Sequence, residues 1–108
     1  MRQGPKSGGI RHIRILVAGG RYELSEKVFG LLADGYFELE DIESSIRTGR
    51  VLKSQKDELA ASVGCKKYVI TGTDTCGYGF YTVGKIMKSS DGYYYFFITA
   101  HDQEANYE

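Results

Sequence analysis

The sequence is poor in the residues that mark several common classes of protein. It has two cysteines, one proline and no tryptophan. Cys65 and Cys76 are too few and too widely spaced for a disulfide framework or a CxxC zinc site, so we expect reduced thiols and a cytoplasmic protein. No apolar run approaches the ~20 residues of a membrane helix, and the N-terminus lacks the apolar core of a signal peptide. We therefore expect no membrane partner.

The chain also lacks an excess of charge. Fourteen basic residues balance fourteen acidic ones, so no overall attraction to RNA, DNA or anionic lipid is predicted. The charge is segregated instead, because acids dominate residues 22–45 and basic residues dominate residues 46–90. A folded chain could present one basic and one acidic face, although scattered solvated charge is the alternative.

The length suits one domain with one core. We interpret residues 1–9, which are polar and glycine-rich, as a flexible arm and residues 10–108 as a single domain. Three helices are predicted. The first lies in IRHIRILVAGG and ends at its two glycines, the second is capped by Ser25 and ends at Gly35, and the third has an acidic start and ends at Gly49.

After Gly49 the hydrophobic period changes from that of helices to that of strands. Strands are predicted in RVLKSQ, KKYVITGTD, YGFYTVGKIMK and YYYFFITAH, and the tight turn SSDG joins the last two into a hairpin. The prediction is an α+β fold, in which two to three N-terminal helices pack on one face of a three- to four-stranded antiparallel sheet.

The last predicted strand is unusually aromatic. Strict alternation places one set of its side chains in the core: Tyr94, Phe96, Ile98 and Ala100. It places the other set toward solvent or a partner: Tyr93, Tyr95, Phe97, Thr99 and His101. This second set is either an ordinary amphipathic sheet surface or a surface that stacks nucleic-acid bases.

The sequence has no phosphate loop, dinucleotide-binding fingerprint, nucleophile elbow or HExxH motif. The acids at positions 38–43 suit helix capping better than acid–base chemistry. No spacing rule joins the histidines and cysteines into a metal site, so neither a metal nor a cofactor is predicted.

A metal-free site of basic and aromatic residues remains. RNA can be cleaved by its own 2′-hydroxyl, given a base, an acid and cations for the phosphate. The catalytic candidates are His101, Lys85, Tyr81 and Lys67. The RNA-binding candidates are Arg47, Arg50, Lys53, Tyr93 and Tyr95. The alternative is that His101 ends a strand without a task.

Three stretches together resemble a known group: YELSEKVFGLLADGYFELEDIESSIRTGRVLKS, KKYVITGTD and YYYFFITAHD. The group consists of small bacterial domains of unassigned function, often placed with the RelE-like ribonuclease toxins and similar in layout to MqsR-type toxins. The resemblance covers about residues 20–101. The positions that match are Ser25, Gly35, Asp41, Ile42, Ile46, Gly49, Gly72, Ile98 and Thr99.

The chain departs from the group at several positions. Lys27 stands where the group tends to have histidine, and Leu31 and Asp34 stand where it has arginines. Ala100 and His101 displace its last aromatic residue. If the histidine and arginines serve catalysis in the group, this chain must use another set.

Two hypotheses follow. The first, implied by the resemblance, is a toxin-like endoribonuclease that needs no metal. The second is an inactive interaction module that binds an antitoxin or another protein through the aromatic face or an unpaired sheet edge. A homodimer through the aromatic face belongs to this second hypothesis.

Overall fold

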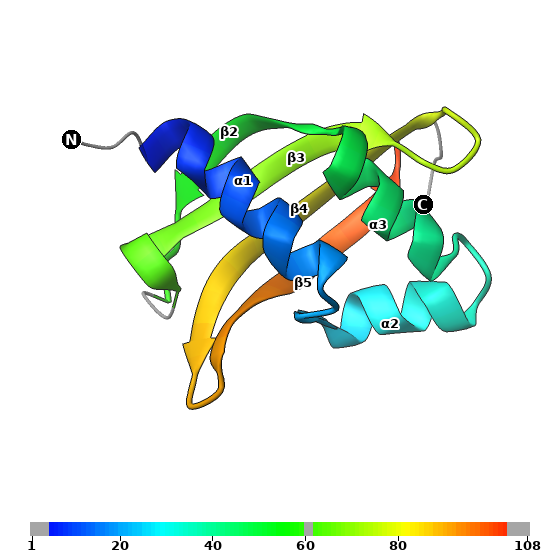
Figure 1. Cartoon of the computed structure of the whole chain (residues 1–108). Helices are drawn as coiled ribbons and strands as arrows, with labels where there is room; N and C mark the ends of the chain where they lie inside the picture. The colour runs from blue at the N-terminus through cyan, green and yellow to red at the C-terminus, as the bar shows by residue number, and fades with distance from the viewer. Residues whose placement is uncertain (1–4, 60–61, 104–108) are drawn as a thin grey trace.

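The computed structural model describes residues 5–59 and 62–103, and places three α-helices on one side of a five-stranded sheet (Figure 1). The elements in chain order are α1 (Pro5–Ala18), β1 (Tyr22–Leu24), α2 (Glu26–Ala33), α3 (Leu39–Thr48), β2 (Arg50–Lys56), the 3-10 turn η1 (Val63–Cys65), β3 (Lys66–Thr73), β4 (Gly79–Ser89) and β5 (Gly92–Asp102). The predicted α+β class, with N-terminal helices packed on a sheet, is confirmed.

The sheet has the strand order β1-β5-β4-β3-β2. Its last four strands in the chain pair antiparallel, as predicted, but β1 pairs parallel with β5 and makes the sheet mixed. The three-residue segment that forms β1 was not predicted, because it is too short to show a period. Only the partner strand defines it: Ser25 N donates to Phe97 O at 2.9 Å, and Tyr95 N donates to Arg21 O at 3.0 Å.

The helix ends follow local signals. Gly20 and Gly35 take positive φ values of 78° and 84° just after α1 and α2, a conformation that suits glycine. Ser25 Oγ accepts from Val28 N at 3.2 Å and caps α2. The helix α1 begins at Pro5, inside the segment expected to be an arm, and proline suits a first helical turn because its missing N–H is not needed there. Residues 1–4 of that predicted arm lie outside the described part of the chain.

Gly49 ends α3 for a different reason from the one that the sequence suggested. Its φ of −90° is ordinary for any residue. A Cβ atom at Gly49 or at Gly72 of β3 would instead collide with the carbonyl oxygen of Ser45. The two glycines therefore let the last turn of α3 lie directly against β3.

A β-bulge in β5 reverses the expected facing of its aromatic side chains. Thr99 pairs with Val83 while Phe97 pairs with Gly84, so Ile98 is an extra residue. As a result, Tyr95, Phe97 and Ala100 are all fully buried under the helices. The prediction was right for Ala100 but wrong for the residues before the bulge, because strict alternation does not survive an inserted residue.

Candidate functional site

The side of the sheet that the helices leave open carries a row of polar side chains across four strands. Arg50 of β2 pairs with Thr71, Thr71 pairs with Tyr81, and Tyr81 pairs with His101 of β5. Directly paired residues share a face, and the sequence neighbours of Thr71, Tyr81 and His101 point into the helix-side core. We call Arg50, Thr71, Tyr81 and His101 the polar row. Three strand spacings of about 4.8 Å make it about 14 Å wide.

Contacts within the polar row are close. The rings of Tyr81 and His101 lie edge to face with centroids 4.2 Å apart. His101 Nδ1 lies 3.2 Å from the carbonyl oxygen of Asp102, and Thr71 Oγ1 donates to Gln103 Oε1 at 3.0 Å. Arg50 is exposed and the other three members are half-buried. The polar row thus presents a guanidinium, two hydroxyls and an imidazole to the same side of the sheet.

The next row along the strands is different in character. Lys53 pairs with Val69, Val69 with Val83, and Val83 with Thr99. Apolar side chains therefore lie beside the polar row, while Lys53 places a second cation on β2, the strand that also carries Arg50. Val69 is 5% exposed and Val83 and Thr99 are half-buried, so this second row offers a ligand little apolar surface.

Lys85 is not part of this open surface. Its side chain is 8% exposed, and its Nζ lies 3.4 Å from Oδ2 of Asp57, which is 2% exposed. The hydroxyl of Ser62 donates to the same oxygen at 2.7 Å. These three buried groups tie the β2–β3 connection to β4. Lys85 therefore serves as the partner of a buried carboxylate, an arrangement that does not fit the catalytic role predicted for it.

The surroundings of Asp57 favour its ionised form. The hydrogen bond from Ser62 lowers the pKa of Asp57, whereas burial of the carboxyl group raises it. The Leu59 amide and the Lys85 ammonium lower this pKa further, so that it falls to about 2. The carboxylate is charged at neutral pH and needs the Lys85 charge beside it. Removing either partner would leave an uncompensated charge under the loop.

Lys67 also lies away from the polar row. It pairs with Gln55, four residues along β3 from Thr71, a separation of about 13 Å at the usual rise per strand residue. Lys67 can contribute charge to a bound polymer, but it cannot act on the same atoms as His101. Of the four catalytic candidates, the structure brings together Tyr81 and His101.

Three of the RNA-binding candidates lie on the helix side of the sheet. Tyr95 is fully buried, so its expected exposure is wrong. Tyr93 is 38% exposed, and its ring packs against His12 of α1 with centroids 5.4 Å apart, so this side chain belongs to the covered face. Arg47 lies on α3. Arg50 and Lys53 remain as RNA-binding candidates on the open face.

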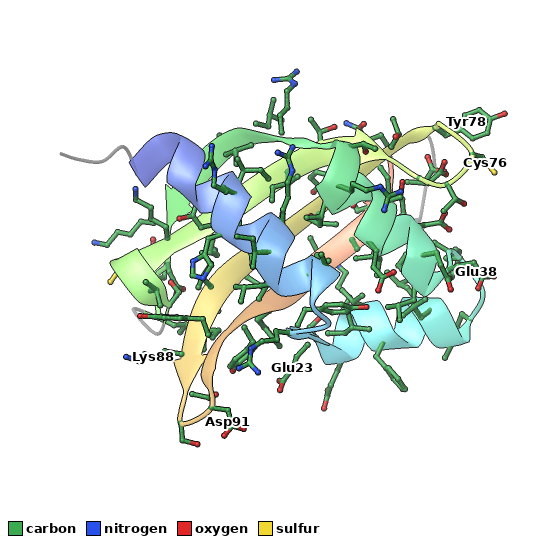
Figure 2. The ribbon with its side chains drawn as sticks, in the orientation of Figure 1. Glu23, Glu38, Cys76, Tyr78, Lys88 and Asp91 are labelled. Carbon is green, nitrogen blue, oxygen red and sulfur yellow. The ribbon has the colours of Figure 1, made fainter. Side chains whose placement is uncertain are left out.

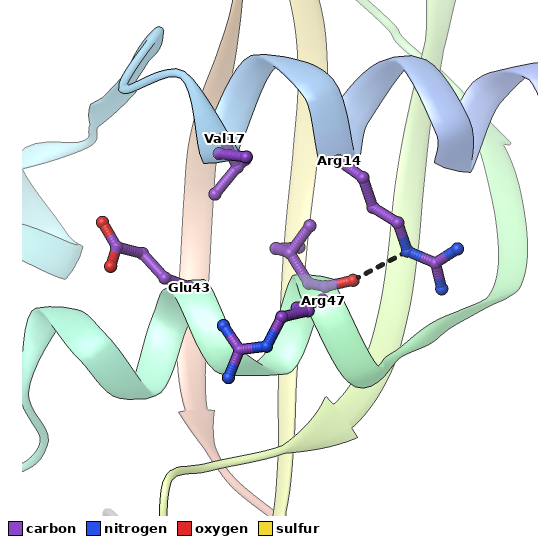
Figure 3. A pocket seen from close by; sticks show the side chains of 6 residues that line it. Arg14, Val17, Glu43 and Arg47 are labelled. Carbon is purple, nitrogen blue, oxygen red and sulfur yellow. Dashed lines mark hydrogen bonds between the residues drawn. The ribbon is translucent and has the colours of Figure 1, made fainter.

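Arg47 borders a groove of about 350 Å³ between α1 and α3, with Val17 and Ile46 among its apolar lining (Figure 3). Arg14 crosses this groove and donates from Nε to Ile46 O at 3.2 Å and from Nη2 to Gly49 O. A cation at the C-terminal end of a helix satisfies its last carbonyl groups. Arg14 therefore joins α1 to α3, which is a structural task.

The cysteines do not approach each other, because Cys65 precedes β3 and Cys76 follows it. Both are free and exposed. Figure 2 shows Cys76 and Tyr78 at the outer end of the β3–β4 loop. Among residues 5–59 and 62–103, no three metal-ligating side chains gather into a group that could hold an ion. In the same residues, no helix is long and apolar enough to cross a membrane.

Sequence reasoning named Arg50, Tyr81 and His101 one by one but missed Thr71. It also missed that the four residues form one row. Strict pairing from the β4–β5 turn would place Tyr81 opposite Ala100, and the extra residue Ile98 moves it opposite His101.

Comparison with protein-family models, with curated proteins and with solved structures finds no significant match to this chain.

Proposed function

We propose that the protein binds single-stranded RNA on the open face of its sheet and cleaves it without a metal ion. The observation that carries the proposal is the polar row, which sets Arg50, Tyr81 and His101 on one face across four strands. Cleavage through the 2′-hydroxyl needs a base for that hydroxyl, a proton donor for the leaving oxygen and cations for the phosphates, and no metal ion is required for these tasks. The resemblance of residues 20–101 to RelE-like ribonuclease toxins implies the same activity.

Three members of the polar row, Arg50, Tyr81 and His101, have proposed roles. Arg50 lies about 14 Å across the sheet from His101 and holds a second phosphate of the same RNA strand, because a guanidinium binds phosphate oxygens in a bidentate manner. His101 takes the proton of the 2′-hydroxyl as the 2′-oxygen bonds to the phosphorus, the bond from phosphorus to the 5′-oxygen breaks, and this leaving oxygen takes a proton from water. The hydroxyl of Tyr81, held beside the imidazole, hydrogen-bonds the reacting phosphate. Lys53 binds a neighbouring phosphate. These residues would replace the helix histidine of the resembling group, where this chain has Lys27. The cytoplasmic location expected from reduced thiols would give the protein access to RNA.

The hypothesis of an interaction module can no longer rest on an exposed aromatic surface. The stripe that it invoked, with the homodimer that would bury it, consists of Tyr93, Tyr95 and Phe97, and these residues belong to the covered side of the sheet. Only the sheet edge remains as a basis for that hypothesis.

The test is cleavage of a mixed-sequence, single-stranded RNA by purified protein in EDTA. We expect cutting by the unchanged protein and a loss of about 10²-fold or more for His101→Ala, since general acid–base catalysis typically contributes 10²–10⁴-fold. Arg50→Ala should weaken RNA binding and raise KM, because it removes a phosphate contact. The matched control is His12→Ala, which changes the other histidine on the helix side and should leave the rate unchanged.

Two outcomes would contradict the proposal in different ways. Cutting of an oligonucleotide with 2′-deoxy sugars at the cleaved positions would exclude attack by the 2′-hydroxyl. No cutting by the unchanged protein would remove the nuclease activity. If that protein also failed to bind RNA at low salt, the RNA-binding face would be excluded as well.

A further inference from the structure

The strand β2 forms one border of the sheet (Figure 1). Within the part of the chain that the structure describes, β3 is the only strand that pairs with it. Six of its seven residues are exposed, and the seventh, Val51, is half-buried. One side of its backbone therefore presents the unpaired N–H and C=O groups of an edge strand.

The charged residues of this edge are all basic. The strand β2 carries Arg50, Lys53 and Lys56, and β3 adds Lys66 and Lys67 opposite Lys56 and Gln55. Residues 50–56 and 66–73 contain no acid. The nearest buried acid, Asp57, is already held by Lys85 and Ser62. Among residues 5–59 and 62–103, none of these five cations forms a salt bridge, so their charge is available to an external partner.

The edge also offers an apolar contact. Leu52 lies among the cations and is 52% exposed. The register with β3 shifts between Val51 and Lys53, so Leu52 is the extra residue of a bulge, while the pairing from Lys53 to Lys56 is regular. An incoming strand would meet an apolar side chain and then a regular run of four residues.

We propose that the β2 edge binds an acidic, extended segment of another protein by strand addition. Backbone hydrogen bonds would supply the pairing, and glutamate or aspartate side chains would lie beside Arg50 and Lys53, which share the open face of the sheet. This inference does not depend on the proposed RNA cleavage, because it uses the unpaired backbone of β2 and not the polar row as a catalytic unit.

A second copy of β2 is the wrong occupant. Pairing two copies of this strand would set cations against cations, and like charges across neighbouring strands are destabilising. Lysines on edge strands commonly prevent such self-association. The same positive charges favour pairing with an acidic strand, so the charge of the edge indicates an acidic partner.

The experiment uses the full chain and a fluorescein-labelled nonapeptide that alternates glutamate and valine. Two further peptides keep the same charge and are N-methylated at every glutamate or at every valine. Only one of these sets of amides can face β2, because alternate amides of a strand point to opposite sides. We expect one methylated peptide to bind at least 10-fold more weakly than the parent, while the other binds like the parent.

Binding is measured by fluorescence anisotropy, and its place is found from amide shifts in NMR spectra. We expect shifts centred on residues 50–56, and at least 10-fold weaker binding for Lys53→Glu. The control Lys27→Glu makes the same charge change on α2 and should bind as the unchanged protein does.

Equal binding of all three peptides would overturn the proposal, because it would show attraction of charge without strand pairing. Shifts centred on another element would overturn it as well. Binding of single-stranded RNA at residues 50–56, with no binding of the parent peptide, would assign the edge to the RNA surface instead. Failure of the RNA cleavage assay would leave each of these results unchanged.

Discussion

The two faces of the β4–β5 pair are made by the same two strands, but they differ in how substitutions affect them. On the covered face, Phe80, Tyr95 and Phe97 are at most 1% exposed. On the open face, Tyr81 and His101 keep part of their surface in water. Buried side chains must fill a fixed volume, whereas half-buried polar groups keep their hydration and can exchange it for a ligand. Changes on the covered face should alter stability, and changes on the open face should alter binding or activity.

The expected loss of stability from a change on the covered face is largest where the sheet contacts α3. Gly72→Ala adds one methyl group on the covered face, where it would collide with backbone of α3. Because backbone cannot move aside as a flexible side chain can, we expect a loss of about 3 kcal/mol or more in the free energy of unfolding, at the upper end for overpacking. Urea denaturation measures this loss.

The matched control for that change is Gly30→Ala in the middle of α2. A Cβ atom at Gly30 meets nothing within 4 Å. Alanine should therefore stabilise the protein by up to about 1 kcal/mol through its higher helix propensity. Equal effects of the two substitutions would mean that the contact between α3 and β3 is not tight.

On the side of the sheet away from the helices, the β2–β3 connection buries a charged group that consists of Asp57, Ser62 and Lys85. Because the pKa of Asp57 lies at about 2, below the usual ~3.9, its stabilisation is complete above about pH 4 and is lost as the pH falls toward 2. Asp57→Asn should lower Tm at pH 5, and the difference from the unchanged protein should close toward pH 2. Thermal denaturation between pH 2 and pH 5 measures this.

A second variant tests the cause of that lowered pKa. Ser62→Ala removes the hydroxyl donor, so the acid-induced loss of stability should begin at a higher pH than in the unchanged protein. A difference in Tm between Asp57→Asn and the unchanged protein that stays constant over the whole range would contradict the lowered pKa.

The smallest expected effect concerns a polar atom on the covered face. The hydroxyl of Tyr95 is buried and has no hydrogen-bond partner among the described residues. Tyr95→Phe should therefore leave the free energy of unfolding unchanged or raise it by up to about 1 kcal/mol, since an unsatisfied buried hydroxyl is unfavourable. Chemical denaturation at neutral pH would detect either result.

Tyr22, which pairs with Tyr95 across β1 and β5, supplies the control. Its hydroxyl donates to Glu43 Oε2 at 2.6 Å, and burial and this hydrogen bond raise the pKa of Tyr22 above its usual value. Tyr22→Phe should lower the free energy of unfolding by about 1.5 kcal/mol or more, because a hydrogen bond to a charged group is lost. If Tyr95→Phe destabilised the protein as much, the buried hydroxyl would have a partner after all.

Local sequence signals predicted much of the helical layer. Ser25 as a cap and Gly35 as a stop act within a few residues of their own position, so no distant contact is needed to infer them. The spacing of Leu39, Ile42 and Ile46 predicts one buried side of α3. Ile42 and Ile46 are at most 1% exposed, whereas Leu39 in the first turn is 36% exposed. Phe29 fits the same period in α2 but is 66% exposed, because no element covers that part of the helix.

The candidate site depended on contacts that no short stretch encodes. The residue types of Arg50, Tyr81 and His101 suggested a site, but the pairing of four strands decided that they share a face. Lys85 is a suitable catalytic type by its chemistry, yet folding of the β2–β3 connection placed it against Asp57. Burial of a side chain by a distant segment cannot be read from the residues around it.

The sequence by itself determined where α1 and α2 end, the order of the three helices before the four long strands, and the strand-forming character of residues 93–101. Only the tertiary structure decided which side of that last strand is buried. A strand has a period of two, so the single extra residue Ile98 sets Tyr95 and Ala100 on the same face and brings His101 opposite Tyr81. Beside the bulge, the Tyr95 ring lies over Gly84, where any Cβ atom would collide with it, so this packing needs a glycine that lies on a different strand from the tyrosine.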